Sequence, residues 1–196
     1  MTPRILAFAG SLRTGSYNKK LVKIAAEGAR KAGAEVTYID LRDFPLPVFD
    51  EDLEKSDGLH PNARKLKDLF LAHHGLLISA PEYNSSITAV LKNTIDWVSR
   101  PCVQPDGTPE PPLGCFDRKV VGLLSASGGA LGGIRGLVEV RRILGNIKCL
   151  VLPDQFSLVK AHEALDDQGH LKDAKQREQA EAIGGKVAAT AAKLHG

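Results

Sequence analysis

The feature that most constrains the fold is the regular alternation of short apolar runs with longer segments of helical periodicity. Five short, largely apolar runs are typical of strands in a parallel sheet; they are 4–10, 34–41, 75–80, 119–125 and 149–153. Five segments carry apolar residues at helical spacing; they are 17–31, 62–73, 86–99, 134–144 and 173–194. Strands that alternate with helices form βαβ units, which predicts a parallel sheet with helices on both faces.

The number of strands narrows the choice of fold further. Five strands fit an α/β, doubly wound, flavodoxin-like sheet of order 2-1-3-4-5 better than the six-stranded dinucleotide-binding sheet. A chain of 196 residues, of which 43% are hydrophobic, is expected to form a single domain over 1–196. The segments 42–61 and 101–117 contain several prolines and are predicted to be loops, and Ser86 is the expected N-cap of the helix that follows.

Charge and composition exclude several classes of partner. The net charge is only +3, and the basic residues are dispersed, so nucleic acid is not required as a partner. The apolar runs are far shorter than the roughly 20 residues of a membrane span, and no basic-then-apolar leader opens the sequence. Three cysteines without a Cys-x-x-Cys pair do not form a secreted disulfide framework. We therefore expect a soluble, cytoplasmic protein that binds neither membrane nor nucleic acid.

Three loops are the candidate ligand site. In a doubly wound sheet, ligands bind outside the carboxyl ends of the strands, at the point where the strand order reverses. This rule selects 10–18, 81–86 and 125–133, and all three are unusual in composition. The prediction is that the three loops meet at one edge of the sheet.

The first loop, GSLRTGSYN, has the residue types that bind a single phosphate. Hydroxyl groups, a helix N-terminus and an arginine favour a phosphate monoester; the candidates are Ser11, Arg13, Ser16 and Asn18. A loop that binds a nucleoside triphosphate is excluded because Ser16 and Tyr17 stand where it needs lysine and Ser/Thr. The G-x-G-x-x-G motif is also absent, which argues against a pyrophosphate bound in the Rossmann manner. The alternative is that these residues only form a turn and a helix cap.

The second loop, PEYNSS, places Tyr83 and Asn84 after the third strand. An aromatic face and an amide there could contact a planar heterocycle, although a proline turn with an N-cap would use the same residues. The third loop, SASGGALGG, is rich in glycine, which lets the backbone approach a ligand closely. Glycine-rich loops are also common without a ligand, so this loop alone does not show that a ligand binds.

Together the three loops carry a resemblance. GSLRTGSYN, PEYNSSITAVLKNTIDWVSR and SASGGALGGIRGL, in this order, resemble the NADPH-dependent FMN reductase family, which includes chromate and quinone reductases of flavodoxin-like fold. The resemblance implies that the first loop holds the FMN phosphate. It implies that Pro81, Glu82, Tyr83 and Asn84 pack on the isoalloxazine ring, and that Ser127, Gly128 and Gly129 approach its edge. The segment 101–117 is longer and richer in proline than the family leads us to expect.

Other candidate residues have simpler interpretations. His73 and His74 follow a helix, where imidazoles favour the helix dipole, and no group of ligands has the spacing of a metal site. No G-x-S-x-G motif is present, which argues against a serine hydrolase. Trp97 is expected to fill the core or a subunit interface. Cys102 and Cys115 are expected to be free surface thiols, with a disulfide between them as the alternative.

The resulting hypothesis is an FMN-dependent NAD(P)H oxidoreductase. Hydride would pass from the nicotinamide to flavin N5, and electrons then to a quinone, azo compound, metal oxyanion or flavin, with no catalytic side chain required. Two alternatives stay open: a flavodoxin-type FMN electron carrier and a phosphate-binding regulatory module without flavin. The sequence does not decide between NADH and NADPH. The resemblance implies a homodimer or homotetramer, in which Trp97, Asp96 and Arg100 would lie at a subunit contact and 101–117 could wall the neighbour's site.

Overall fold

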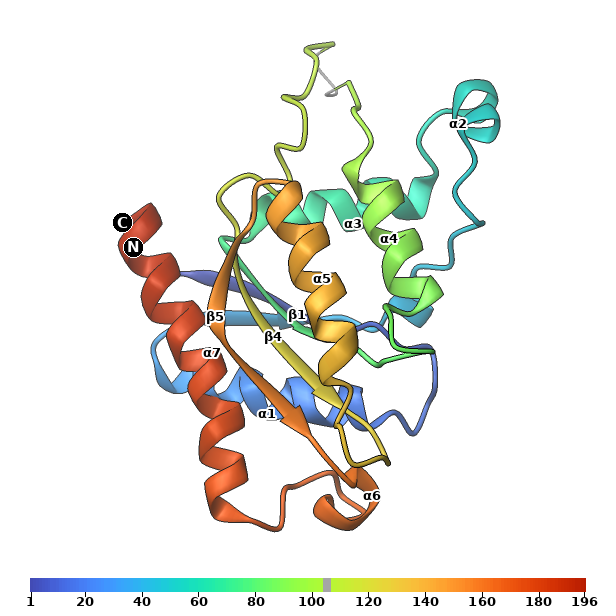
Figure 1. Ribbon diagram of the computed structural model, residues 1–196. Helices are drawn as coiled ribbons and strands as arrows, with labels where there is room; N and C mark the ends of the chain where they lie inside the picture. The colour runs from blue at the N-terminus through green and yellow to red at the C-terminus, as the bar shows by residue number, and fades with distance from the viewer. Residues whose placement is uncertain (104–106) are drawn as a thin grey trace.

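The computed structural model describes residues 1–103 and 107–196, and these contain one five-stranded parallel sheet (Figure 1). Its strands are β1 (Arg4–Ala9), β2 (Glu35–Tyr38), β3 (Gly75–Ser79), β4 (Val120–Ala126) and β5 (Leu150–Leu158). Their order is β2-β1-β3-β4-β5, with every neighbouring pair parallel. The predicted fold class and strand order are confirmed.

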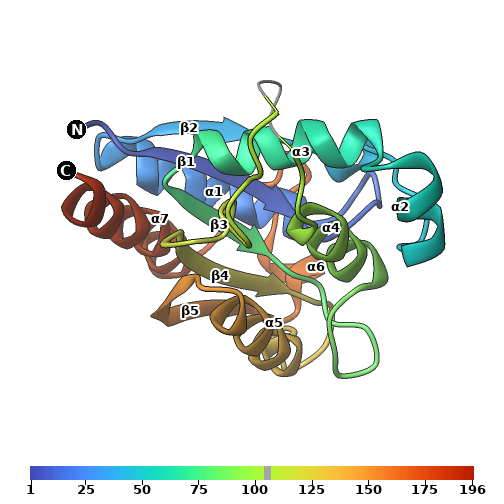
Figure 2. The ribbon, with the colours of Figure 1, turned by 90° about the horizontal axis from the view of Figure 1, so that it is seen from above.

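Helices cover both faces of the sheet. The helical elements are α1 (Tyr17–Lys31), η1 (Leu41–Asp43), α2 (Glu51–Asp57), α3 (Pro61–Ala72), α4 (Ala89–Ser99), α5 (Ile134–Asn146), α6 (Ala161–Ala164) and α7 (Ala174–His195). α1 and α7 pack on one face, and α3, α4 and α5 pack on the other (Figure 2). Because both faces are covered, the central strands β1, β3 and β4 are buried along nearly their whole length.

Successive residues of a strand point to opposite faces, so each strand contributes to two cores. In β1, Ile5 and Ala7 belong to the core under α1 and α7. Leu6 and Phe8 belong to the core under α3, α4 and α5. The continuous apolar runs in the sequence therefore reflect burial on both sides of the sheet.

The helices α1 and α7 touch backbone to backbone at two glycines. A methyl group at Gly28 would lie 1.9 Å from the carbonyl oxygen of Glu181, and one at Gly184 would lie 1.8 Å from that of Ala25. No real Cβ fits at such distances, so any side chain at Gly28 or Gly184 would push the helices apart. Helix α1, which follows the first loop, is thereby fixed against α7.

The segment 42–61 was predicted to be a loop, and this is wrong in part because it contains most of η1 and all of α2. Both elements begin with a side-chain cap: Asp40 accepts a hydrogen bond from the N–H of Arg42, and Asp50 from that of Asp52. α2 contains no buried residue, so it has no apolar periodicity from which it could be predicted. The sequence signal for η1 and α2 is the aspartate that caps each of them.

The start of α4 and the end of β5 also differ from the prediction, and one short helix was not predicted. α4 begins at Ala89 with Thr88 as its N-cap, so the prediction of Ser86 as the cap is wrong. The Thr88 hydroxyl also donates to the carbonyl of Gly10, 2.8 Å away, which joins this helix to the first loop. β5 continues to Leu158, past the predicted end, and α6 follows it.

Trp97 belongs to the core of its own chain, which is one of its two expected places, and the subunit contact that the resemblance implied for it is wrong. It is 1% exposed, and its Nε1–H donates to the carbonyl of Pro47 at 2.8 Å. Its ring also packs edge-on against Phe49, with 5.1 Å between the ring centroids. Asp96 and Arg100 do not pair with each other, because they bind Lys92 and Glu54 respectively.

The proline-rich segment lies at the amino ends of the strands, where α4 ends and β4 begins, away from the three candidate loops (Figure 1). Residues 104–106, which belong to the predicted loop 101–117, lie outside the described part of the chain. Glu110 fixes the segment to α3 through ion pairs with Arg64, at 2.6 Å, and with Lys67, at 2.5 Å.

The cysteines of this segment do not form a disulfide. Cys102 and Cys115 are both free thiols. Cys115 is buried, which corrects the expectation of a surface thiol there, and burial raises the pKa of its thiol to about 11. Cys102 is half-buried beside Arg64.

Candidate functional site

The three predicted loops converge on one cavity of about 170 Å³. Every predicted site residue except Asn84 and Gly129 lines it, together with Tyr17 and Ala126, which the sequence analysis did not select. The lining residues are Ser11, Arg13, Ser16, Tyr17, Asn18, Pro81, Glu82, Tyr83, Ala126, Ser127 and Gly128. Convergence at the carboxyl ends of β1, β3 and β4 is what the topology rule requires.

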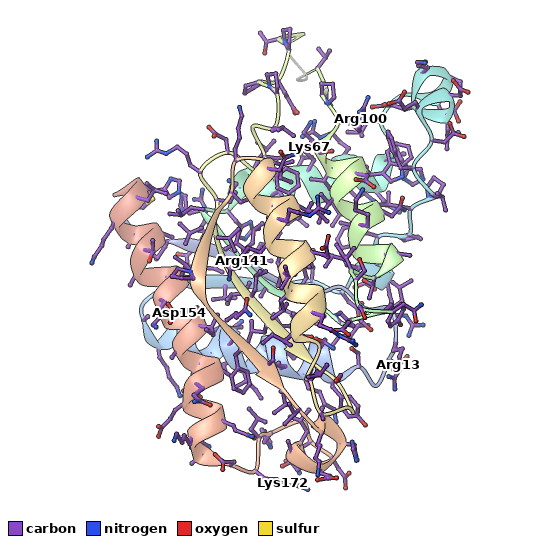
Figure 3. The ribbon with its side chains drawn as sticks, viewed as in Figure 1. Arg13, Lys67, Arg100, Arg141, Asp154 and Lys172 are labelled. Carbon is purple, nitrogen blue, oxygen red and sulfur yellow. The ribbon has the colours of Figure 1, made fainter. Side chains whose placement is uncertain are left out.

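The N-terminus of α1 opens into this cavity. Ser16 is the N-cap, yet its hydroxyl makes no capping hydrogen bond, and the first turn contains no acidic residue. Ser11 is 4% and Ser16 is 3% exposed, and the N–H of Arg13 donates to the Ser11 hydroxyl at 3.3 Å. An uncapped positive helix end flanked by two hydroxyls and the exposed Arg13 fits a phosphate group. In Figure 3, Arg13 lies near one end of α4, whereas Lys67 and Arg100 lie near the other end.

Asn18 makes hydrogen bonds within the protein that the sequence analysis did not predict. Its Nδ2 donates to the carbonyl of Ala126 at 2.8 Å. Its Oδ1 accepts from the Ser79 hydroxyl at 2.8 Å and from the Ala126 N–H at 3.0 Å. The side chain therefore joins α1 to the ends of β3 and β4 and braces the cavity wall. A contact of Asn18 with phosphate stays a prediction.

The second loop is a tight two-residue turn. Tyr83 and Ser86 exchange backbone hydrogen bonds of 3.0 Å in both directions. Between them, Asn84 and Ser85 have φ values of 51° and 67°, the left-handed conformation that a type I′ turn requires at both central residues. Asn84 thus forms the exposed tip of the turn, and the structure does not bring it into the cavity.

Glu82 connects the second loop to α5. Its carboxylate accepts from Arg135 Nε at 2.8 Å and from the backbone N–H groups of Arg135 and Gly136 at 3.0 and 3.1 Å. Burial raises the pKa of this carboxyl, but the hydrogen bonds from Arg135 and Gly136 outweigh burial, so its pKa lies below the usual 4.5. This pair could not be predicted from the sequence, because Glu82 and Arg135 are far apart in the chain.

The third loop is held against the end of β5. The Ser127 N–H donates to the Leu158 carbonyl at 3.1 Å, and the Lys160 N–H donates to the Gly129 carbonyl at 3.1 Å. The Gly129 N–H donates to the Ser127 hydroxyl at 3.2 Å, which leaves Gly128 as the glycine at the cavity rim. At Gly133, φ is +86° and a methyl group would lie 2.0 Å from the Ser125 hydroxyl oxygen, so only glycine fits there.

The lining groups are suited to binding more than to proton transfer. Among the described residues, no histidine or cysteine lines the cavity, and its one carboxylate, Glu82, is neutralised by Arg135. No group of three metal-ligand side chains occurs in the described ranges. His73 is the C-cap of α3, and its ring lies 2.6 Å from the Leu69 carbonyl oxygen and 2.9 Å from Thr37 Oγ1, so both ring nitrogens have partners within the fold.

Comparison with known proteins decides the family. The model of the NADPH-dependent FMN reductase family matches residues 3–163. The chain belongs to this family. The match confirms the resemblance, and with it an oxidoreductase that works with FMN and NAD(P)H.

Individual relatives agree with the family match. An NAD(P)H-dependent FMN reductase of Pseudomonas aeruginosa is 35% identical over 176 residues, which cover 89% of this chain and 88% of the relative. A probable NADPH:quinone oxidoreductase of Oryza sativa subsp. japonica is 32% identical over 183 residues, covering 90% and 82%. The flavoenzyme NAD(P)H:(acceptor) oxidoreductase FerB of Paracoccus denitrificans superposes with a TM-score of 0.78 over 98% of both chains. At 22% identity this last likeness shows the fold.

No described helix of this FMN reductase family member is long and apolar enough to cross a membrane.

Proposed function

We propose that this chain is an FMN-dependent NAD(P)H oxidoreductase that delivers electrons to a small-molecule acceptor: a quinone, azo compound, metal oxyanion or free flavin. The observation that carries the proposal is the cavity in which an uncapped helix N-terminus, two buried hydroxyls and Arg13 meet the second and third loops. Bound FMN supplies the redox chemistry, by hydride transfer at N5, and the protein binds and orients it. The quinone oxidoreductases among the relatives support a quinone as acceptor.

The residues divide into two groups under this proposal. Ser11, Arg13 and Ser16 bind the phosphate, because they combine hydroxyls and a guanidinium at the positive end of α1. The cavity is small for a whole ligand pocket, so the planar ring would lie at its mouth against Pro81, Glu82 and Tyr83. These residues would hold the ring where a nicotinamide, and then an acceptor, could reach it.

Charge at the ring edge would be stabilised by the backbone of the third loop. Gly128 is at the rim of the cavity, whereas the Gly129 N–H is engaged by Ser127. We therefore assign this role to the Gly128 N–H and give Gly129 the supporting one of shaping the loop. Glu82 would act as a positioning residue, since its pairing with Arg135 fixes the second loop relative to α5.

An absorption spectrum of the purified protein tests this function. The expected result is a flavin spectrum that NADH or NADPH bleaches in the absence of air and that an added quinone restores. A flavin spectrum that neither nucleotide bleaches would instead support a flavodoxin-type electron carrier. A protein that binds no flavin would overturn both of these functions and favour a phosphate-binding module.

The proposal includes a cytoplasmic homodimer or homotetramer. Its support is an exposed apolar area, in which Leu12 is 49% and Val48 is 83% exposed, beside a hollow of about 490 Å³. All three cysteines are free thiols, which suits a reducing compartment. Light scattering measures the assembly, and a mass near 21.0 kDa for the active protein would show that one chain is sufficient.

A further inference from the structure

The short helix α6 is held against the third loop, which forms one side of the proposed flavin cavity of about 170 Å³. The Ala161 N–H donates to the Ser127 carbonyl at 2.9 Å, and the Lys160 N–H donates to the Gly129 carbonyl at 3.1 Å. Figure 1 shows α6 beyond the arrowheads of β4 and β5. The start of α6 is therefore anchored at the edge of the sheet where the three site loops meet.

His162 lies in this anchored helix, and its two ring nitrogens face different neighbours. Its Nδ1 faces Gly128 at the cavity rim, since a methyl group on that glycine would lie 3.6 Å from Nδ1. Its Nε2 lies 3.4 Å from Oε1 of Glu163, within ion-pair distance. The imidazole thus stands between the rim of the flavin cavity and a carboxylate. The side chain is 52% exposed, so it also reaches water.

The carboxylate of Glu163 determines which ring nitrogen exchanges a proton. A carboxylate beside one imidazole nitrogen favours a proton on that nitrogen. In the neutral ring of His162 the proton therefore stays on Nε2, and Nδ1 is the nitrogen that gains and loses one. Within the described ranges, Nδ1 has no hydrogen-bond partner in the fold. It is therefore available to a molecule that lies at the mouth of the flavin cavity.

The charged groups around His162 favour its protonated form. Glu163 is the carboxylate that faces the ring. Lys160 lies 3.7 Å from this carboxylate, and the Lys172 ammonium donates to the backbone carbonyl of Glu163 at 2.9 Å. The third loop, over 125–133, contains no charged side chain. A positive charge on the imidazole is therefore balanced by Glu163, in a partly exposed position where water also solvates it.

The groups that line the flavin cavity are poorer proton donors than His162. Its carboxylate, Glu82, is bound by Arg135 and its pKa is lowered, so it carries no proton near neutral pH. The guanidinium of Arg13 keeps its protons. Hydroxyl groups and phenols release theirs far less readily than an imidazolium, which is the side-chain group that titrates near neutral pH.

Reduction of a quinone requires a proton donor. A quinone becomes a hydroquinone by taking up two electrons and two protons. A hydride carries both electrons and one proton, so a second proton has to reach the quinone oxygen. From the observations above we propose that His162 is a catalytic residue that donates this proton.

In this step the bond between Nδ1 and its proton breaks, and the O–H bond of the hydroquinone forms. Glu163 stabilises the imidazolium before the transfer and holds the Nε2 proton after it. Water then returns a proton to the exposed ring. The inference rests on the proposed function and deepens it, because it assigns the proton of the acceptor reaction to a side chain outside the lining of the cavity.

Stopped-flow measurement of flavin reoxidation tests the inference. The FMN-loaded protein is first reduced with NADH in the absence of air and then mixed with duroquinone or with ferricyanide. Duroquinone takes up protons when it is reduced, whereas ferricyanide takes up an electron alone. We expect His162→Gln to slow reoxidation by duroquinone about 100-fold, at the lower end of the range for general acid catalysis because water partly replaces an exposed donor. Reoxidation by ferricyanide should keep the wild-type rate.

The pH profile and two further variants sharpen the test. In the wild type, reoxidation by duroquinone should slow as the pH rises, since only the protonated ring donates, and His162→Gln should lose this dependence. Glu163→Gln should slow the same reaction by a smaller factor. His170→Gln is the matched control, because His170 also pairs with a carboxylate, Asp166, at 3.2 Å but does not lie at the flavin cavity; it should behave as the wild type.

Proton NMR of the oxidised protein provides a readout that does not depend on turnover. The ring signals of His162 are identified by their loss in His162→Gln. We expect them to shift when FMN is added to the FMN-free protein, because the flavin ring would lie beside Gly128, and we expect those of His170 to stay in place. An unchanged His162 signal would show that the ring of His162 is not beside the flavin.

The kinetic outcomes separate this inference from the proposed function. Wild-type rates with duroquinone in His162→Gln, or an equal loss in His170→Gln, would overturn the inference. Equal slowing with duroquinone and ferricyanide would show that His162 affects the flavin and not the proton, and would also overturn it. A wild type that NADH bleaches but duroquinone does not reoxidise would overturn it as well. In each case, bleaching by NADH would leave the NAD(P)H oxidoreductase in place.

Discussion

Replacing Asn18 by alanine tests whether this side chain braces the cavity wall. The change removes three hydrogen bonds, from Nδ2 to the Ala126 carbonyl and to Oδ1 from the Ser79 hydroxyl and the Ala126 N–H. Asn18 is 4% and Ser79 0% exposed, so water does not readily replace the lost partner. A buried polar group that loses its partner costs about 1–3 kcal/mol.

The three losses are not independent because they share one side chain, so their sum is an upper bound. We expect the free energy of unfolding to fall by about 3 kcal/mol, the equivalent of roughly 6–12 °C in Tm for a domain of this size. Asn18→Asp keeps an acceptor but turns an oxygen toward the Ala126 carbonyl, so we expect it to be destabilising as well. Asn146→Ala, at an exposed position at the end of α5, is the matched control and should stay within about 0.5 kcal/mol of the wild type.

Urea unfolding of the FMN-free protein measures these effects apart from cofactor binding. The midpoint should shift while the m-value is unchanged, since the amount of surface exposed on unfolding is the same. If Asn18→Ala unfolds within about 1 kcal/mol of the wild type, the three bonds do not carry the bracing role assigned to them.

Three further predictions concern the same edge of the sheet. Arg13→Ala should weaken FMN binding about 10- to 100-fold, measured by flavin fluorescence titration, and leave the urea midpoint unchanged because Arg13 is exposed; equal affinity would remove it from the phosphate site. Gly133→Ala should destabilise the protein by more than about 2 kcal/mol through the clash with Ser125. Gly145→Ala, in the helix that Gly133 caps, has open space around it and should stabilise the protein by about 0.5–1 kcal/mol. Thermal melts compare the two variants. Because the pKa of Glu82 is lowered on folding, its contribution is present above the ordinary pKa of 4.5 and is lost as the pH falls through the lower folded value. Stability measured against pH should therefore fall less steeply below about pH 4.5 in Glu82→Gln than in the wild type, and identical slopes would contradict the assignment.

The sequence predicted the sheet and the convergence of the three loops for a physical reason. Strands buried on both faces must be apolar throughout, and loops at their carboxyl ends must meet, so composition and topology together were sufficient. Arg13, Ser16 and Gly128 line one cavity as expected.

Side-chain partners could not be predicted in the same way. Glu82 binds Arg135, and Asn18 binds Ala126, across separations in sequence that only the folded sheet closes. The choice between core and subunit contact for Trp97 could not be made from the sequence, because periodicity shows which face of a helix is apolar but not what covers it. Here Pro47 and Phe49, from a segment predicted to be an exposed loop, cover the ring.

The contact between α1 and α7 has a consequence for synthesis on the ribosome. The face of α1 that carries Gly28 is covered by residues around Gly184, which are made after all three site loops. Until α7 emerges, β1 and α1 hold an apolar surface without its cover, although all three site loops have long been synthesised. The first loop therefore reaches its final position only after α7 has been made, and flavin should be acquired by a chain that already contains α7.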